Sequence, residues 1–228
     1  MKSLKLAFTG CLAAAVLCLA PVTAAAQGSG MDLLKKMEEK FQGLKSVSGE
    51  FTQQLSDSDK AFADLKKPTP TAAHFSLLKP NFFRAEYQDA PGQPPSVQLI
   101  SGQMFYNYVP QLKQVTTYKF QGASNVRDLN YLLLGFGAKA DEVQRVYSVE
   151  AVKNGVKLTP RNPQEASFRY IIMHVDPQSL YPTDFAMKQS DGKDLVVKMN
   201  LGTLKINPPL SPGNFQPNFP KEAARVSM

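Results

Sequence analysis

Two stretches decide the fold: VSGEFTQQ at residues 47–54 and FSLLKPNFFRAEY at residues 75–87. In the first stretch every second residue from Val47 to Leu55 shares one face, and the polar residues between them share the other. This two-residue period is typical of a half-buried strand. In the second stretch Lys79-Pro80-Asn81 separates two aromatic-rich strands, because proline cannot donate to a ladder and Pro-Asn favours a turn. The pattern predicts antiparallel strands, and taken alone it also fits an ordinary hairpin.

The rest of the chain extends this pattern into one sheet. We expect strands near residues 47–56, 71–79, 82–88, 96–101, 103–109, 112–120, 144–152, 155–160, 167–175, 181–189 and 193–202. Asn154-Gly155 and Asp191-Gly192 are typical of hairpin turns that need a positive φ. No parallel crossover rhythm is present, so the sequence predicts a single curved antiparallel sheet of about eleven strands.

Two helices accompany the predicted sheet. Residues 31–41 place Leu33, Leu34, Met37 and Phe41 at helical spacing among charged residues, which predicts an amphipathic helix. Asn125 can cap a second helix that runs through Leu134, with Asp128 in its first turn. Gly135 and Gly137 are expected to end it.

The N-terminus is typical of a secretory signal peptide. Lys2 and Lys5 precede an apolar run from Leu6 to Ala20, and Ala24-Ala25-Ala26 offers small residues for cleavage. We therefore expect residues 1–26 to be removed and residues 27–228 to form one domain. A retained membrane anchor or a lipid attached to Cys11 or Cys18 are the alternatives.

Composition excludes several classes of function. Removal of the leader takes away both cysteines, so neither a disulfide nor a thiolate metal site is expected. It also leaves 24 basic and 19 acidic residues, a net charge of +5, with lysines that are scattered rather than clustered. No nucleic-acid stripe is therefore expected. His74 and His174 belong to no catalytic motif, and no cofactor site, metal site or enzymatic activity is predicted.

The ordered set of motifs resembles the LolA family of periplasmic lipoprotein carriers. The resemblance rests on the following stretches: Phe51-Thr52-Gln53-Gln54, residues 79–84, residues 99–108, residues 131–135 and Asn207-Pro208-Pro209-Leu210 with Phe215 and Phe219. It covers most of residues 31–226. It implies a half-open barrel closed by a helical lid, in the periplasm.

The apolar residues of the helices and strands allow two interpretations. They form a permanent core, which the residues alone favour, or they form a lid over a lipid-binding cavity, which the resemblance favours. The lid candidates are Leu33, Leu34, Met37, Phe41, Leu133 and Leu134. The cavity candidates are Phe51, Phe83, Leu99, Met104, Phe185 and Met187. Methionine and aromatic side chains suit acyl chains, which have no fixed shape.

The resemblance also implies partners and a latch. Acylated lipoproteins would be the cargo, an inner-membrane ABC transporter of the LolCDE type would load a monomeric carrier, and an outer-membrane acceptor like LolB would unload it. The best-known members have an arginine at the position of Lys79, where it holds the lid, so Lys79 is expected to be a weaker latch. The alternatives are a periplasmic sensor or scaffold of the same fold, and a carrier of another lipid or glycolipid.

Overall fold

The computed structural model describes residues 29–56, 70–88, 91–120, 131–164 and 166–227. The predicted signal peptide and the predicted helix start at Asn125 and Asp128 lie outside these residues. No helix in the described ranges is long and apolar enough to cross a membrane.

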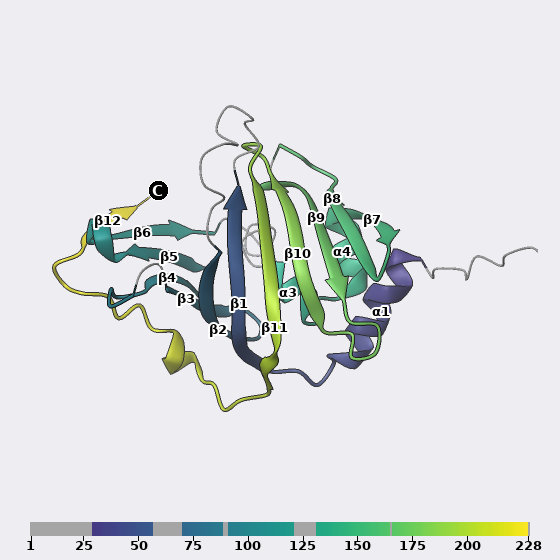
Figure 1. Ribbon diagram of the computed structural model, residues 1–228, viewed down its shortest axis with the longest axis horizontal. Coiled ribbons are helices and arrows are strands. Elements are labelled where there is room, and N and C mark those ends of the chain that lie inside the picture. Colours follow the sequence, from purple (N-terminus) through teal and green to yellow (C-terminus); the bar gives the residue numbers. More distant parts are fainter. Residues whose placement is uncertain (1–28, 57–69, 89–90, 121–130, 165, 228) are drawn as a thin grey trace, which may run out of the picture.

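One mixed sheet dominates the molecule (Figure 1). Its described strands are β1 (Ser46–Ser56), β2 (Thr71–Leu78), β3 (Phe82–Gln88), β4 (Ser96–Ser101), β5 (Met104–Val109), β6 (Gln114–Lys119), β7 (Tyr147–Val152), β8 (Gly155–Pro160), β9 (Phe168–Val175), β10 (Pro182–Gln189), β11 (Asp194–Ile206) and β12 (Ala224–Ser227). Their order is β12-β6-β5-β4-β3-β2-β1-β11-β10-β9-β8-β7, with β1 and β11 near the middle. The edges β12 and β7 do not pair with each other in the described strands, so the sheet is open.

The predicted antiparallel sheet is confirmed, with one strand added. The eleven expected strands correspond to β1–β11, and Asn154 and Gly192 have the positive φ that the hairpin turns require. The additional strand, β12, pairs in parallel with β6, and the other strand pairs of the described sheet are antiparallel. The four residues of β12 are all exposed, so no buried alternation marks it in the sequence.

The two faces of the sheet pack against different partners. On the concave side, apolar residues of the strands and helices form one large group, which we call the inner cluster. On the convex side, Val97, Leu99 and Phe215 form a smaller group, the outer cluster, with Phe82 and Phe219 among the residues packed against it. Phe215 belongs to the 3₁₀ helix η3 (Pro212–Phe215) in the C-terminal segment that follows β11.

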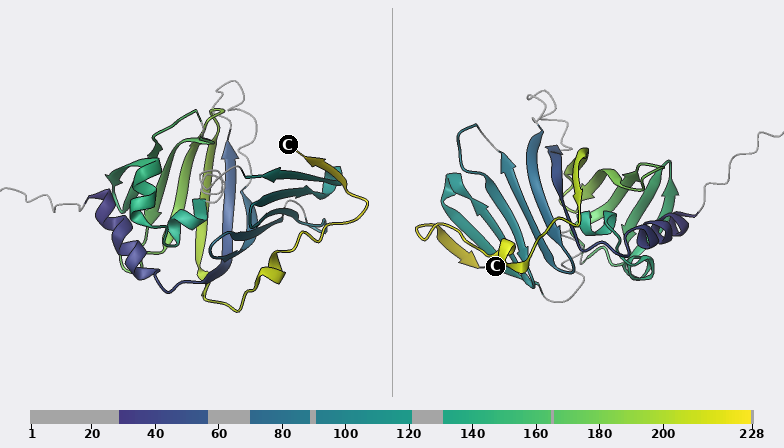
Figure 2. Two further views of the ribbon diagram at one scale, coloured as in Figure 1. Left: turned by 180° about the vertical axis from the view of Figure 1, so that it is seen from behind. Right: turned by 90° about the horizontal axis from the view of Figure 1, so that it is seen from below.

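In the described part of the chain, three short α-helices lie on the concave side (Figure 2). They are α1 (Gly30–Lys40), α3 (Tyr131–Gly135) and α4 (Ala140–Val146); a further 3₁₀ turn, η2 (Pro110–Leu112), joins β5 to β6. Helix α1 begins with a capping box, in which the side chains of Ser29 and Asp32 each accept a backbone N–H of the other residue. The predicted first helix is thus present, and α3 lies at the end of the predicted second one.

Helix α4 differs from the prediction, which placed a strand from residue 144. Ala140 and Val143 are buried on one side of α4. Asp141 and Glu142 occupy its first turn, where the negative charge of a carboxylate interacts favourably with the helix dipole. The residue at its N-cap is Lys139, whose side chain makes no capping hydrogen bond. The usual start signal of a helix is therefore missing from the local sequence.

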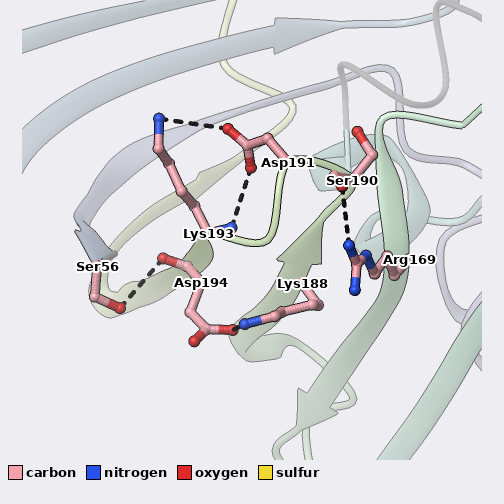
Figure 3. Close-up of polar contacts among 7 residues, drawn as sticks. All are labelled: Ser56, Arg169, Lys188, Ser190, Asp191, Lys193 and Asp194. Carbon is pink, nitrogen blue, oxygen red and sulfur yellow. Dashed lines mark hydrogen bonds and ion pairs between the residues drawn. The ribbon is translucent and has the colours of Figure 1, made fainter. Parts of the chain in front are cut away.

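Polar contacts fix the hairpin between β10 and β11 (Figure 3). Asp191 Oδ1 accepts the backbone N–H of Lys193 at 3.1 Å, and this hydrogen bond is the main reason why the pKa of the Asp191 carboxyl is lowered. Lys188 Nζ lies 3.0 Å from Asp194 Oδ1 across the two strands. These contacts hold the register that places Phe185 and Met187 on the concave face.

Candidate functional site

Four of the six predicted cavity residues lie together on the concave face. Phe51, Phe83, Phe185 and Met187 are all buried members of the inner cluster. The ring of Phe51, for example, lies with its centroid 5.9 Å from that of Tyr87 in an edge-on arrangement. The alternation along β1, β3 and β10 places these side chains, as the sequence pattern predicts.

Leu99 and Met104 differ from the prediction, because they lie on the convex side. Leu99 is fully buried in the outer cluster. It pairs with Tyr106 of β5, and Met104 shares the face of Tyr106 because the two are separated by two residues along the strand. Strand β4 has buried apolar residues on both faces, with Ile100 in the inner cluster and Val97 and Leu99 in the outer cluster. The C-terminal segment covers the convex residues, so apolarity alone does not identify the concave face.

Most of the predicted lid residues lie in or beside the helices and pack against the concave face of the sheet. Leu34, Met37 and Phe41, in and just after α1, are buried in the inner cluster, as is Leu134 in α3, and Leu33 is partly buried against it. The side chain of Leu133 lies outside the described part of the structure. The helices and the sheet are thus two layers joined by apolar contacts.

Phe41 joins the end of α1 to two other segments. Its ring lies 5.9 Å from that of Phe136, in an edge-on arrangement, and 5.6 Å from that of Tyr181, in a stacked one. Gly137 follows Phe136 with a φ of +86°, and a Cβ atom there would lie only 2.6 Å from the Cβ of Phe41. The α3–α4 connection therefore approaches α1 as closely as glycine allows.

Lys79 reaches the same connection from the sheet. Its Nζ donates to the carbonyl oxygen of Gly137 at 3.4 Å, a long hydrogen bond. Desolvation by burial lowers the pKa of this half-buried ammonium below its ordinary value of 10.5. The predicted latch residue thus contacts the connection between two of the helices, and whether it acts as a latch stays a prediction.

A second polar contact was missed by the sequence analysis. The carboxylate of Glu38 in α1 accepts the backbone N–H of Ala140, the first residue of α4, at 2.9 Å. It supplies the cap that the local sequence of α4 lacks, and its negative charge interacts favourably with the positive, N-terminal end of the helix dipole. Glu38 is 102 positions away in the sequence, so no local pattern could have indicated this role.

No group of three or more His, Cys, Asp and Glu side chains in the described residues is arranged to hold a metal ion. A pocket of about 620 Å³ lies beside β1, β2 and β11, and its lining includes Glu50, His74 and Lys198. These three polar side chains alternate with residues of the inner cluster along their strands, such as Phe51 on β1 and Ala73 on β2, so they lie on the convex face of the sheet.

The sequence profile of one family matches most of this arrangement. The family is described as outer membrane lipoprotein carrier protein LolA, and the match covers residues 42–218. The chain belongs to the LolA family. The matched range includes β1–β11, the helices α3 and α4, and the first part of the C-terminal segment, whereas α1 precedes it.

The solved structures to which this LolA-family chain is similar have little sequence in common with it. An uncharacterized conserved protein from Thermus thermophilus is 14% identical, with a TM-score of 0.50, and the match covers 86% of this chain and 98% of that one. A LolA superfamily protein from Nitrosomonas europaea is 11% identical, with a TM-score of 0.45, and 82% and 97% of the two chains are covered. MucB, in its complex with MucA from Pseudomonas aeruginosa, is 12% identical, with a TM-score of 0.43, and 87% and 64% are covered. No curated protein sequence gives a significant match.

Proposed function

We propose that this protein carries lipoproteins between the two membranes of the cell envelope, with their acyl chains held between the concave face of the sheet and the helices. The observation that carries the proposal is the two-layer interior of a LolA-family chain. Phe51, Phe83, Phe185 and Met187 would contact the acyl chains, and α1, α3 and α4 would form the lid. Residues 1–26 would direct the chain to the periplasm.

The free energy of burying lid side chains is similar in size to that of burying acyl chains, so one set of contacts can be exchanged for the other. Burying a side chain such as Leu34 or Met37 is worth about 1.5–3 kcal/mol. Burying a methylene group of an acyl chain is worth about 0.8 kcal/mol, so one chain of roughly sixteen carbons is worth about 12 kcal/mol. An acyl chain that enters the interior can therefore replace the contacts of several lid residues. Binding and release are then of comparable energy, as a carrier requires.

Few polar contacts oppose such an exchange. Among the described residues, Lys79 and Glu38 each make one hydrogen bond to the segment from Gly137 to Ala140. Arg161, just after β8, also donates from its Nε to the carbonyl oxygen of Gln144 in α4 at 2.9 Å. The inner cluster supplies apolar contacts between the layers, and apolar contacts are not directional. Loading by an inner-membrane ABC transporter and unloading by an outer-membrane acceptor would supply the energy and the direction.

The experiment that tests this proposal is mass spectrometry of lipid and lipopeptide extracted from the protein purified from the periplasm. A carrier yields acylated lipoproteins in amounts that increase when acceptor membranes are withheld. A sensor or scaffold of the same fold, which the fully buried Phe51 and Phe185 would also suit, yields none. Extraction of a lipid without attached protein would contradict the lipoprotein assignment and favour another lipid or a glycolipid.

A further inference from the structure

The concave face carries a polar row at the end of the sheet opposite to the helices. Gln98 of β4 pairs with Asn107 of β5, and Asn107 pairs with Thr116 of β6. We call these three residues the polar row. Directly paired residues project to the same face, and Gln98 also pairs with Ala85 of the inner cluster, so the row faces the concave side.

The row lies next to aromatic side chains that border the proposed acyl site. Along β5 and β6, Phe105 and Tyr118 are the neighbours of the row on the same face, and both pack against the inner cluster. Figure 2 shows α1, α3 and α4 over the half of the sheet that contains β7–β10, whereas β4–β6 form the other half. The polar row is therefore adjacent to the apolar interior, on the side away from these helices.

The polar row can both donate and accept hydrogen bonds, and it carries no charge. Tyr87 Oη donates to Gln98 Oε1 at 3.0 Å, and Gln114 Nε2 donates to Thr116 Oγ1 at 3.1 Å. Between them, the half-buried side chain of Asn107 makes no hydrogen bond with any described residue. The Asn107 amide is therefore available to a ligand on the concave side, with one oxygen that can accept and one NH₂ that can donate.

We infer that the polar row binds the main chain of the cargo polypeptide directly after its acylated residue. This inference rests on the proposed function, because the acyl chains and the polypeptide of a lipoprotein are covalently joined. A cargo with its acyl chains in the inner cluster must place its first peptide groups beside that cluster. An asparagine side chain offers one acceptor and two donors, which complement the C=O and N–H of a peptide group.

The chemistry of the row favours main-chain recognition over recognition of a charged head group. No charged side chain belongs to the row, so it contributes no ionic contact to a phosphate or an amine. With strands about 4.8 Å apart, the row spans about 10 Å, which is the length of about three residues of an extended chain. Contacts to the main chain do not depend on the cargo sequence, which suits a carrier of many different lipoproteins.

The test compares three probes on the purified full-length mature protein and its variants. The probes are palmitic acid, a synthetic lipopeptide with two palmitoyl chains on its N-terminal cysteine followed by four serines, and a dipalmitoyl glycolipid with a neutral sugar. Asn107→Leu removes the amide at similar volume, and Asn107→Ala serves as a second variant if leucine disturbs the fold. Gln54→Leu removes an amide from the convex face of β1 and is the matched control.

We expect Asn107→Leu to raise the Kd for the lipopeptide about three- to tenfold, the loss typical of one hydrogen bond, and to leave that for palmitic acid unchanged. Gln54→Leu should bind all three probes like the parent. An equal Kd for the lipopeptide in parent and variant, or an equal loss for lipopeptide and palmitic acid, overturns the inference and leaves the carrier proposal intact. A loss confined to the glycolipid also overturns it and assigns the row to a sugar. Absence of binding of every acylated probe by the parent overturns both the inference and the proposed function.

Discussion

The carboxylate of Glu38 joins two parts of the lid, and its removal should loosen them. In Glu38→Ala, the N–H of Ala140 loses the acceptor 2.9 Å away, and α4 loses its only described cap. Loss of a helix cap typically costs about 1 kcal/mol, and a partly buried N–H without a partner adds a cost of similar size. We therefore expect a decrease of about 1–2 kcal/mol in the free energy of unfolding. In a domain of this size that corresponds to a decrease of about 3–6 °C in Tm.

The measurement combines thermal unfolding with hydrogen exchange of the Ala140 amide. Glu39→Ala is the matched control, because Glu39 is the next residue of α1 and its exposed side chain makes no hydrogen bond to a described residue. Glu38→Gln keeps an acceptor without the charge and should lie between the parent and Glu38→Ala. If Glu38→Ala and Glu39→Ala unfold at the same temperature and Ala140 exchanges as in the parent, the cap does not hold the lid.

Two further predictions concern the lid and the interior. The pKa of Lys79 is lowered in the folded protein, so in the alkaline range below pH 10.5 the unfolded chain binds more protons and the free energy of unfolding rises with pH. Lys79→Leu should remove this rise, and so should Lys79→Arg, whose guanidinium does not titrate in that range. Unfolding measured against pH would contradict this if the parent and both variants give curves of the same shape. Phe83→Glu places a carboxylate among buried apolar side chains and should abolish acyl binding, with a loss of several kcal/mol in the free energy of unfolding. A variant that folds and binds palmitic acid like the parent would show that Phe83 does not line the site.

The strands were predictable because their signals are local. Alternation along β1 and β3 and the turn residues Asn154 and Gly192 set their bounds to within a few residues. The concave positions of Phe51, Phe83 and Phe185 follow from the same alternation. In these elements the local preferences agree with the tertiary structure.

The remaining features depend on contacts between distant segments. The C-terminal segment buries the convex side of β4, so an apolar residue is expected there as well as on the concave side. The apolar character of Leu99 therefore could not show which face it occupies. Glu38 caps α4 from another helix, so the helix has no start signal of its own. The amide of Asn107 joins the site only through the pairing of β4, β5 and β6, which no sequence motif marks.

The position of β1 beside β11 has a consequence for the order in which the chain can fold. The strands β2–β6 follow one another in both sequence and space, as do β7–β11, so each half of the sheet can form from local hairpins. The seam between the halves pairs Phe51 with Met199, and closing so long a loop is slow compared with forming a hairpin. We expect amides of the β1–β11 seam to become protected later than those of β8 and β9 in pulsed hydrogen exchange during refolding, and simultaneous protection would contradict this order. Until the seam closes, the aromatic side chains of β1 and β2 have no partner from the second half, and this is the stage at which the chain is most exposed to aggregation.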